Sequence, residues 1–243
     1  MTNERKKISV PLTIFLVIIF SVTTSYGVFY FKDNQIKQQA KTNEKHEKIR
    51  EEIKTVQESI NTLTAGINYD QRRKFLITQF QEIILKENKD VSSQNAYKIA
   101  ENNIDFCDRF KRIDPALLFA IQSVESSFKE IANSRDGARG LNQMIPSTAR
   151  LLCKYLGWEY SPKLLDDPFK STYLACTYLD MLHVEYDGNI EQILAEYNGG
   201  PSAAYWIKVD PNKTCPDVRN YLKKVLAKKD EYSKISKSLI MGG

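Results

Sequence analysis

A single carboxylate, Glu125, stands where a general acid is expected. Leu118, Ile121, Glu125 and Phe128 recur at the three- and four-residue spacing of one helix face, which puts Glu125 on the apolar side of its helix. Burial without a partner cation raises a carboxyl pKa and keeps the group protonated near neutral pH. Glu125 is therefore a candidate proton donor. The competing interpretation is a glutamate at the margin of the face, reaching solvent or pairing with a lysine or arginine.

Two later segments carry groups that could hold a polar polymer. Gln143 stands between a break at Gly140 and Pro146, in a loop between two predicted helices. Its amide can donate and accept hydrogen bonds at once, which suits sugar hydroxyl and acetamido groups. Tyr197 and Asn198 end an amphipathic helix. Taken alone, that pair is also typical of an ordinary Asn-Gly helix stop with a core tyrosine.

Helices must position these side chains. Asp114-Pro115 predicts a helix start, because the aspartate caps free amides and proline loses nothing at the first helical position. Pro146 opens another helix, which Gly157 ends. Helical periodicity runs throughout, and no stretch shows convincing strand alternation. The sequence predicts an all-α fold.

Residues from Ala96 to Leu226 resemble the soluble lytic transglycosylase (SLT) domain family of the lysozyme-like superfamily. The matching pieces are DPALLFAIQSVESSF, GARGLNQMIPSTA, LLDDP, YLDML, LAEYNGGP and VRNYLKKVL. They stand in the family's order and at its spacing. The resemblance implies a lysozyme-like catalytic domain.

The resemblance also implies roles for five residues. By position, Glu125 resembles the catalytic acid/base, and Gln143 resembles the glutamine that binds saccharide in the cleft. Tyr197 resembles the tyrosine that faces the catalytic carboxyl, and Asn198 completes that motif. Ser134 matches a serine near the N-acetyl group of the substrate. Ser134, Gln143, Tyr197 and Asn198 are the expected substrate-binding residues, and Glu125 is the expected catalytic residue.

The chain departs from the family pattern at three places. Asn142 stands where the family usually has a methionine, and Glu196 stands where it has a small residue. Met144-Ile145 swaps the order of a similar apolar pair. Asn142 is expected to alter a subsite of the cleft.

The implied function is that of a membrane-anchored peptidoglycan lytic transglycosylase. Glu125 would protonate the oxygen of the β-1,4 link between N-acetylmuramic acid and N-acetylglucosamine. It would then take the proton of the muramyl C6 hydroxyl, which closes onto C1 and leaves a 1,6-anhydromuramyl end. One carboxyl suffices, whereas most glycosidases use two, and Glu130 and Asp136 belong to no recognisable motif.

Two other functions stay open. A hydrolase of goose-lysozyme type would admit water to the same bond. A wall-binding or assembly scaffold would keep only a vestigial cleft, although such a scaffold would not need Glu125, Gln143 and Tyr197 together.

The N-terminal part predicts export. Residues 8–31 contain no charge and are long enough to span a bilayer as a signal anchor. The basic residues 5–7 place the short segment 1–7 in the cytoplasm. The rival interpretation is a cleaved signal peptide with its core in residues 11–22. Either way we expect the catalytic domain on the periplasmic or extracellular side of the cytoplasmic membrane.

The anchor is followed by a polar segment, residues 32–90, predicted to be a helical stalk or coiled coil. Its apolar residues alternate spacings of four and three; they are Ile49, Ile53, Val56, Ile60, Leu63 and Ile67. This seam is consistent with a homo-oligomer through residues 46–67 or with a helix laid on the catalytic domain. The catalytic domain is expected over residues 91–228, with a C-terminal tail at 229–243.

Composition narrows the partners. A net charge of +5 suits an anionic wall or membrane surface. The basic run between Lys223 and Lys229 lacks interleaved aromatics, so we expect no nucleic acid. Four cysteines in the exported domain permit two disulfides in three pairings. No cysteine pair has CxxC spacing, and only two histidines exist, so neither a metal nor a cofactor is expected.

Overall fold

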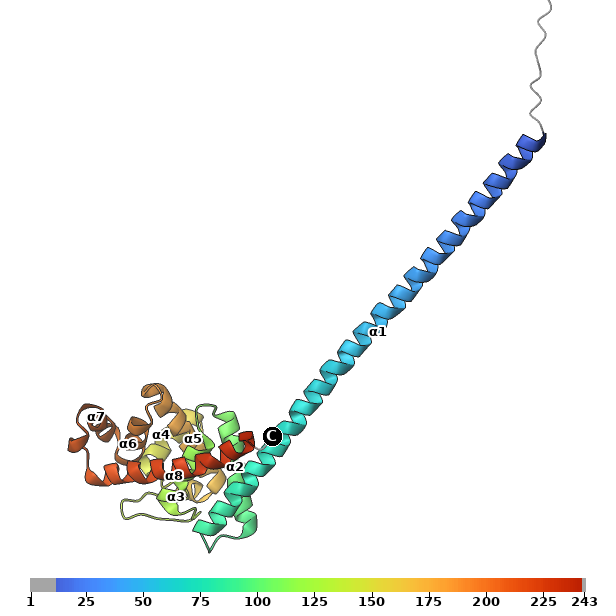
Figure 1. Ribbon diagram of the computed structural model, residues 1–243. Coiled ribbons are helices and arrows are strands. Elements are labelled where there is room, and N and C mark those ends of the chain that lie inside the picture. The colour runs from blue at the N-terminus through green and yellow to red at the C-terminus, as the bar shows by residue number, and fades with distance from the viewer. Residues whose placement is uncertain (1–11, 242–243) are drawn as a thin grey trace, which may run out of the picture. The chain divides into compact units, whose positions relative to one another are not determined.

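The computed structural model describes residues 12–241, and its regular elements are helices. Along the chain they are α1 (Leu12–Glu87), α2 (Ser93–Arg109), α3 (Pro115–Ser126), α4 (Pro146–Leu156), η1 (Pro162–Asp166), α5 (Pro168–Glu185), α6 (Ile190–Gly199), α7 (Pro201–Val209), η2 (Pro211–Lys213) and α8 (Pro216–Met241) (Figure 1). No strand occurs within residues 12–241, where the loop after α3 contributes two isolated bridges. The predicted all-α fold is confirmed.

The chain separates into two compact units, residues 1–67 and 68–243. From Leu12 onward the first unit is helical, and its seam residues are exposed, from 42% at Ile49 to 68% at Leu63. The first unit is thus helical, as predicted for the stalk. Its oligomerisation stays a prediction.

The segment predicted to cross a membrane, residues 8–31, begins outside the described residues. Within residues 12–241, no helix combines the length and the apolar character needed to cross a bilayer.

The second unit starts earlier than the predicted boundary at residue 91. The last turns of α1 bury Leu76, Ile77, Phe80 and Ile84 in the core that α2 and α3 also form. The rings of Phe80 and Phe119 stack with their centroids 3.7 Å apart. Residues 68–87 are therefore part of the second unit, because its core depends on their apolar side chains.

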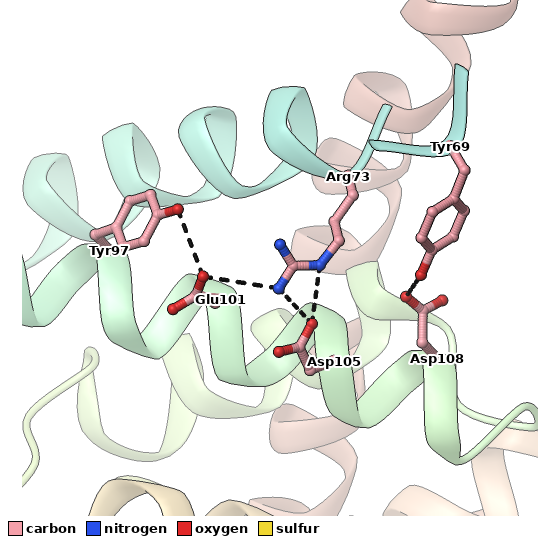
Figure 2. A network of polar contacts seen from close by, with 6 residues as sticks. All are labelled: Tyr69, Arg73, Tyr97, Glu101, Asp105 and Asp108. Atoms are coloured by element: carbon pink, nitrogen blue, oxygen red, sulfur yellow. Dashed lines mark hydrogen bonds and ion pairs between the residues drawn. The ribbon is translucent and has the colours of Figure 1, made fainter. Parts of the chain in front are cut away.

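Polar contacts also join this part of α1 to α2 (Figure 2). The Arg73 guanidinium donates to Asp105 through Nε at 3.0 Å and through Nη2 at 2.6 Å. It also lies 3.7 Å from Glu101, and the Tyr69 hydroxyl donates to Asp108. These contacts lie at the surface, so they orient the two helices more than they stabilise them.

Helix α3, which carries Glu125, lies at the centre of the second unit. Its residues from Ala116 to Ile121 are wholly buried, and α8 runs beside it (Figure 1). Asp114 caps the helix by accepting from the Ala116 amide at 3.0 Å, and Pro115 occupies the first turn as predicted. The helix ends at Ser127, which has a left-handed φ of 51°.

All four cysteines are free, so the two disulfides expected from an exported domain are not formed in the structure. Cys107 and Cys176 belong to the main core, and Cys153 lies in a second apolar cluster under α4. Cys215 is exposed. The three buried thiols pack as small apolar side chains. An even number of cysteines in a sequence does not distinguish this role from disulfide pairing.

Candidate active site

Glu125 lies in the last turn of α3, where burial raises the pKa of its carboxyl to about 7. No lysine, arginine or histidine of the described chain forms an ion pair with it. The residue as a whole is half-buried because it lines the cavity, and pairing with a cation is not found among the described residues. A carboxyl with such a pKa is populated in both protonation states near neutral pH and can give and take a proton.

Tyr221 of α8 is a neighbour of Glu125 that the sequence analysis did not single out. Its hydroxyl acts against the effect of burial and lowers the pKa of Glu125. The side chain is 6% exposed, and its hydroxyl has no hydrogen-bond partner other than Glu125 among the described residues. The available signal was the helical spacing of Val218, Tyr221, Leu222 and Val225, a buried face that carries one polar atom.

All five residues predicted for the site line one cavity of about 550 Å³. Glu125 comes from α3, Ser134 and Gln143 from the loop after it, and Tyr197 and Asn198 from the end of α6. The cavity also has walls that were not predicted, among them Tyr178 and Glu196. Its size is that of a site for a small molecule or for a few units of a polymer.

The loop between α3 and α4 is held by a close backbone approach. Gly140 has a φ of 75°, and a side-chain carbon there would lie 1.8 Å from the Leu165 carbonyl oxygen. Arg139 fixes the same stretch by a bidentate pair with Asp166, at 3.0 and 2.5 Å. Gln143 follows with a left-handed φ of 44°.

Gln143 uses its donors inside the loop. Its Nε2 donates to the carbonyl oxygens of Ala132 at 3.2 Å and Gly140 at 2.9 Å. Both amide hydrogens are thereby engaged, which leaves the side-chain oxygen as the group that can accept from a ligand. The expected double capacity of this glutamine is therefore reduced to acceptance.

Ser134 is exposed at the mouth of the cavity. Its Oγ accepts from the Ala138 amide at 3.0 Å, so the hydroxyl hydrogen is available to a ligand.

Tyr197 joins the far wall of the cavity to the loop. Its hydroxyl donates to the carbonyl oxygen of Asn142 at 2.9 Å, and its ring lies 5.9 Å from that of Tyr178. Burial raises the pKa of Tyr197, and the nearby charge of Glu125 raises it further. The hydroxyl therefore stays protonated near Glu125, and the role of this tyrosine toward the carboxyl stays a prediction.

Asn142 does not form a subsite of the cleft, contrary to our expectation. Its side chain is fully buried and hydrogen-bonds Gln122, Ser171 and Thr172 at 3.0 to 3.1 Å. Asn103 completes this network through Gln122. The departure from the family pattern is therefore accommodated beneath the site, because partners from α3 and α5 satisfy the amide.

Asn198 is exposed, and the two glycines after it allow α6 and α7 to meet. A side-chain carbon at Gly199 would lie 2.7 Å from Val218, and Gly200 has a φ of 78°. Close packing thus explains the Asn-Gly-Gly-Pro segment, and the exposed amide of Asn198 is left at the wall of the cavity.

Residues 102–214 match the family model of the transglycosylase SLT domain. This part of the chain is therefore similar to the SLT family.

One curated relative is the Haemophilus influenzae protein named "Putative soluble lytic murein transglycosylase". It is 34% identical over 89 residues, which are 36% of this chain and 15% of the relative. The match thus spans about one seventh of that relative's length.

Two solved structures are similar to parts of the chain. An inactive mutant of the lytic transglycosylase Slt from Pseudomonas aeruginosa is 25% identical with a TM-score of 0.49, over 55% of this chain and 23% of its own. The 70 kDa soluble lytic transglycosylase from Escherichia coli is 24% identical, also with a TM-score of 0.49, over 71% of this chain and 30% of its own.

Proposed function

We propose that this protein is a peptidoglycan lytic transglycosylase that uses Glu125 first as general acid and then as general base. The observation that carries the proposal is a carboxyl with a pKa near 7 in the cavity that Gln143 and Tyr197 also line. The match of residues 102–214 to the family model of the transglycosylase SLT domain supports the same reaction.

The reaction needs a proton to move in both directions. Protonated Glu125 donates to the glycosidic oxygen between N-acetylmuramic acid and N-acetylglucosamine, and the bond to C1 breaks. The acetamido group of the substrate stabilises the positive sugar centre. The Glu125 carboxylate then accepts the proton of the muramyl C6 hydroxyl while its oxygen bonds to C1. Glu125 ends protonated, no water is consumed, and a pKa near the working pH suits both steps.

The surrounding groups serve binding and orientation. The Gln143 oxygen accepts from a sugar hydroxyl or amide, and Ser134 and Asn198 offer polar contacts at the rim. Tyr197 and Tyr221 keep neutral hydroxyls near the carboxyl, since burial raises the pKa of both. Tyr221 can donate to the carboxylate that forms after the first proton transfer, whereas the Tyr197 hydroxyl already donates to the Asn142 carbonyl oxygen.

The test is mass spectrometry of purified peptidoglycan digested with the wild type or with Glu125→Gln. We expect anhydromuramyl products from the wild type and none from Glu125→Gln. A Glu130→Gln control should form the same products at the wild-type rate. Reducing ends that contain added water would move the protein to the goose-type hydrolases. Cleavage by Glu125→Gln at the wild-type rate would exclude Glu125. A folded wild type without products would favour the scaffold.

The location of the activity is part of the proposal. The charge-free run 8–31 behind basic residues supports an anchor in the cytoplasmic membrane, with the catalytic unit exported. The full chain is then expected to sediment with membranes, to resist carbonate extraction and to be released by detergent. Release by carbonate alone would contradict the anchor.

A further inference from the structure

Glu196 is one of three carboxylates that line the cavity, with Glu125 and Asp136, and it stands where the family pattern has a small residue. It precedes Tyr197 on α6, lines the cavity, and is 7% exposed. The sequence analysis noted the departure but gave the residue no role.

The Glu196 carboxylate accepts hydrogen bonds from two tyrosine hydroxyls. Its Oε1 accepts from the Tyr178 hydroxyl at 3.2 Å, and its Oε2 accepts from the Tyr186 hydroxyl. Burial, and secondarily the charge of Glu196, raise the pKa of both tyrosines, so both remain neutral donors. No ion pair of the described chain involves Glu196.

A buried carboxylate without a cation is costly unless something else supplies the charge. Each of its oxygens has accepted one hydrogen bond and can accept another. The part of the chain that the structure describes offers no lysine, arginine or histidine in the lining of the cavity. The missing positive group must therefore come from whatever enters the cavity.

We infer that Glu196 is a specificity residue that binds a primary ammonium group of the wall polymer, an inference that rests on the proposed function. Two sources carry this chemistry: a glucosamine unit that lacks its acetyl group, and the free amine of a diamino acid in a stem peptide. Tyr178 and Tyr186 hold the carboxylate in the wall of the cavity by their hydrogen bonds.

The first experiment compares binding of N-acetylglucosamine hexamers and glucosamine hexamers by calorimetry, at a pH where the amines are protonated. We expect the wild type to bind the amine form about ten-fold more tightly, the scale of a charge-assisted hydrogen bond. Glu196→Gln, which preserves the shape, should lose that preference. Glu191→Gln removes the same charge from an exposed position of α6 and should retain it.

A second arm separates the two sources of the amine. Acetylated glycan strands are offered with stem peptides whose amines are either free or chemically acetylated. A Glu196-dependent preference for strands with free amines would show that the bound ammonium group comes from the stem peptide. A preference seen only with the hexamers would show that it comes from the sugar.

Equal binding of both hexamers and both strands by the wild type would overturn the inference and leave the proposed function standing. A preference that survives in Glu196→Gln would also overturn it. If no glycan of any kind bound to the folded protein, the proposed function and this inference would fall together.

Discussion

At the scale of single residues, Glu125 is held where ionisation is disfavoured. Its pKa of about 7 exceeds the ordinary value of 4.5, because burial penalises the charged form more than Tyr221 favours it. Proton linkage turns this difference into a dependence of stability on pH. Stability is unaffected below the unfolded pKa, falls as pH rises from about 4.5 to 7, and stays reduced above that range.

Glu125→Gln should therefore stabilise the protein while it abolishes cleavage. The gain is expected to be near zero at pH 4 and on the order of 3 kcal/mol at pH 8, since one pKa unit corresponds to about 1.4 kcal/mol. Denaturant unfolding of both proteins at the two pH values measures it. A gain of equal size at pH 4 and pH 8 would contradict the link to ionisation, and the exposed Glu191→Gln serves as the control.

The sequence predicted the position of Glu125 well, because helical spacing alone puts the residue on a buried face. It could not predict the surroundings of Asn142, whose partners Gln122 and Thr172 come from distant segments. Tyr221 was missed for a similar reason. Its hydroxyl comes near Glu125 only because α8 packs against α3.

At the scale of elements, the loop after α3 depends on one glycine. Gly140→Ala would add a carbon 1.8 Å from the Leu165 carbonyl oxygen at a φ of 75°. The backbone must move, and Gln143 moves with it. We expect a loss of more than about 2 kcal/mol in the free energy of unfolding, together with weaker glycan binding.

Gly137→Ala is the matched control for that change. Gly137 lies in the same loop with a φ of 82°, yet a side-chain carbon there would meet nothing within 4 Å. Only the conformational cost of about 1–2 kcal/mol applies. Chemical denaturation compares the two variants, and equal losses would show that the contact with Leu165 does not decide the stability of the loop.

The connection between α6 and α7 illustrates what a sequence pattern leaves open. An Asn-Gly pair after an amphipathic helix predicts a helix end, and α6 does end at Gly199. The pattern does not reveal that the neighbouring Glu196 is buried against two tyrosines. Those tyrosines lie on α5 and at its end, so their approach follows from the packing of α5 against α6.

At the scale of the whole molecule, the first unit keeps an apolar seam exposed in a single chain. Its six residues alternate spacings of four and three, as in a coiled coil, and each is at least 42% exposed. The seam supports the proposal that copies of the chain associate through residues 46–67.

Replacing Ile53 and Ile60 by aspartate should abolish that association. Analytical ultracentrifugation of the detergent-solubilised chain is expected to show an oligomer for the wild type and a monomer for Ile53→Asp/Ile60→Asp. Exchanging the exposed Glu51 and Glu58 for glutamine is the control, because these side chains lie off the seam. A monomeric wild type at micromolar concentration would contradict self-association through this helix.

Stacking between Phe80 and Phe119 limits how far the protein can be trimmed. Phe119 belongs to the helix that carries Glu125, and the ring against it comes from the last turns of α1. A protease that cut ahead of residue 68 would release the catalytic unit with its core complete. A cut at residue 91 would remove Leu76, Ile77, Phe80 and Ile84, and expose the back of the catalytic helix to water. Proteolytic shedding at the first position would thus yield a free enzyme, and at the second would inactivate it.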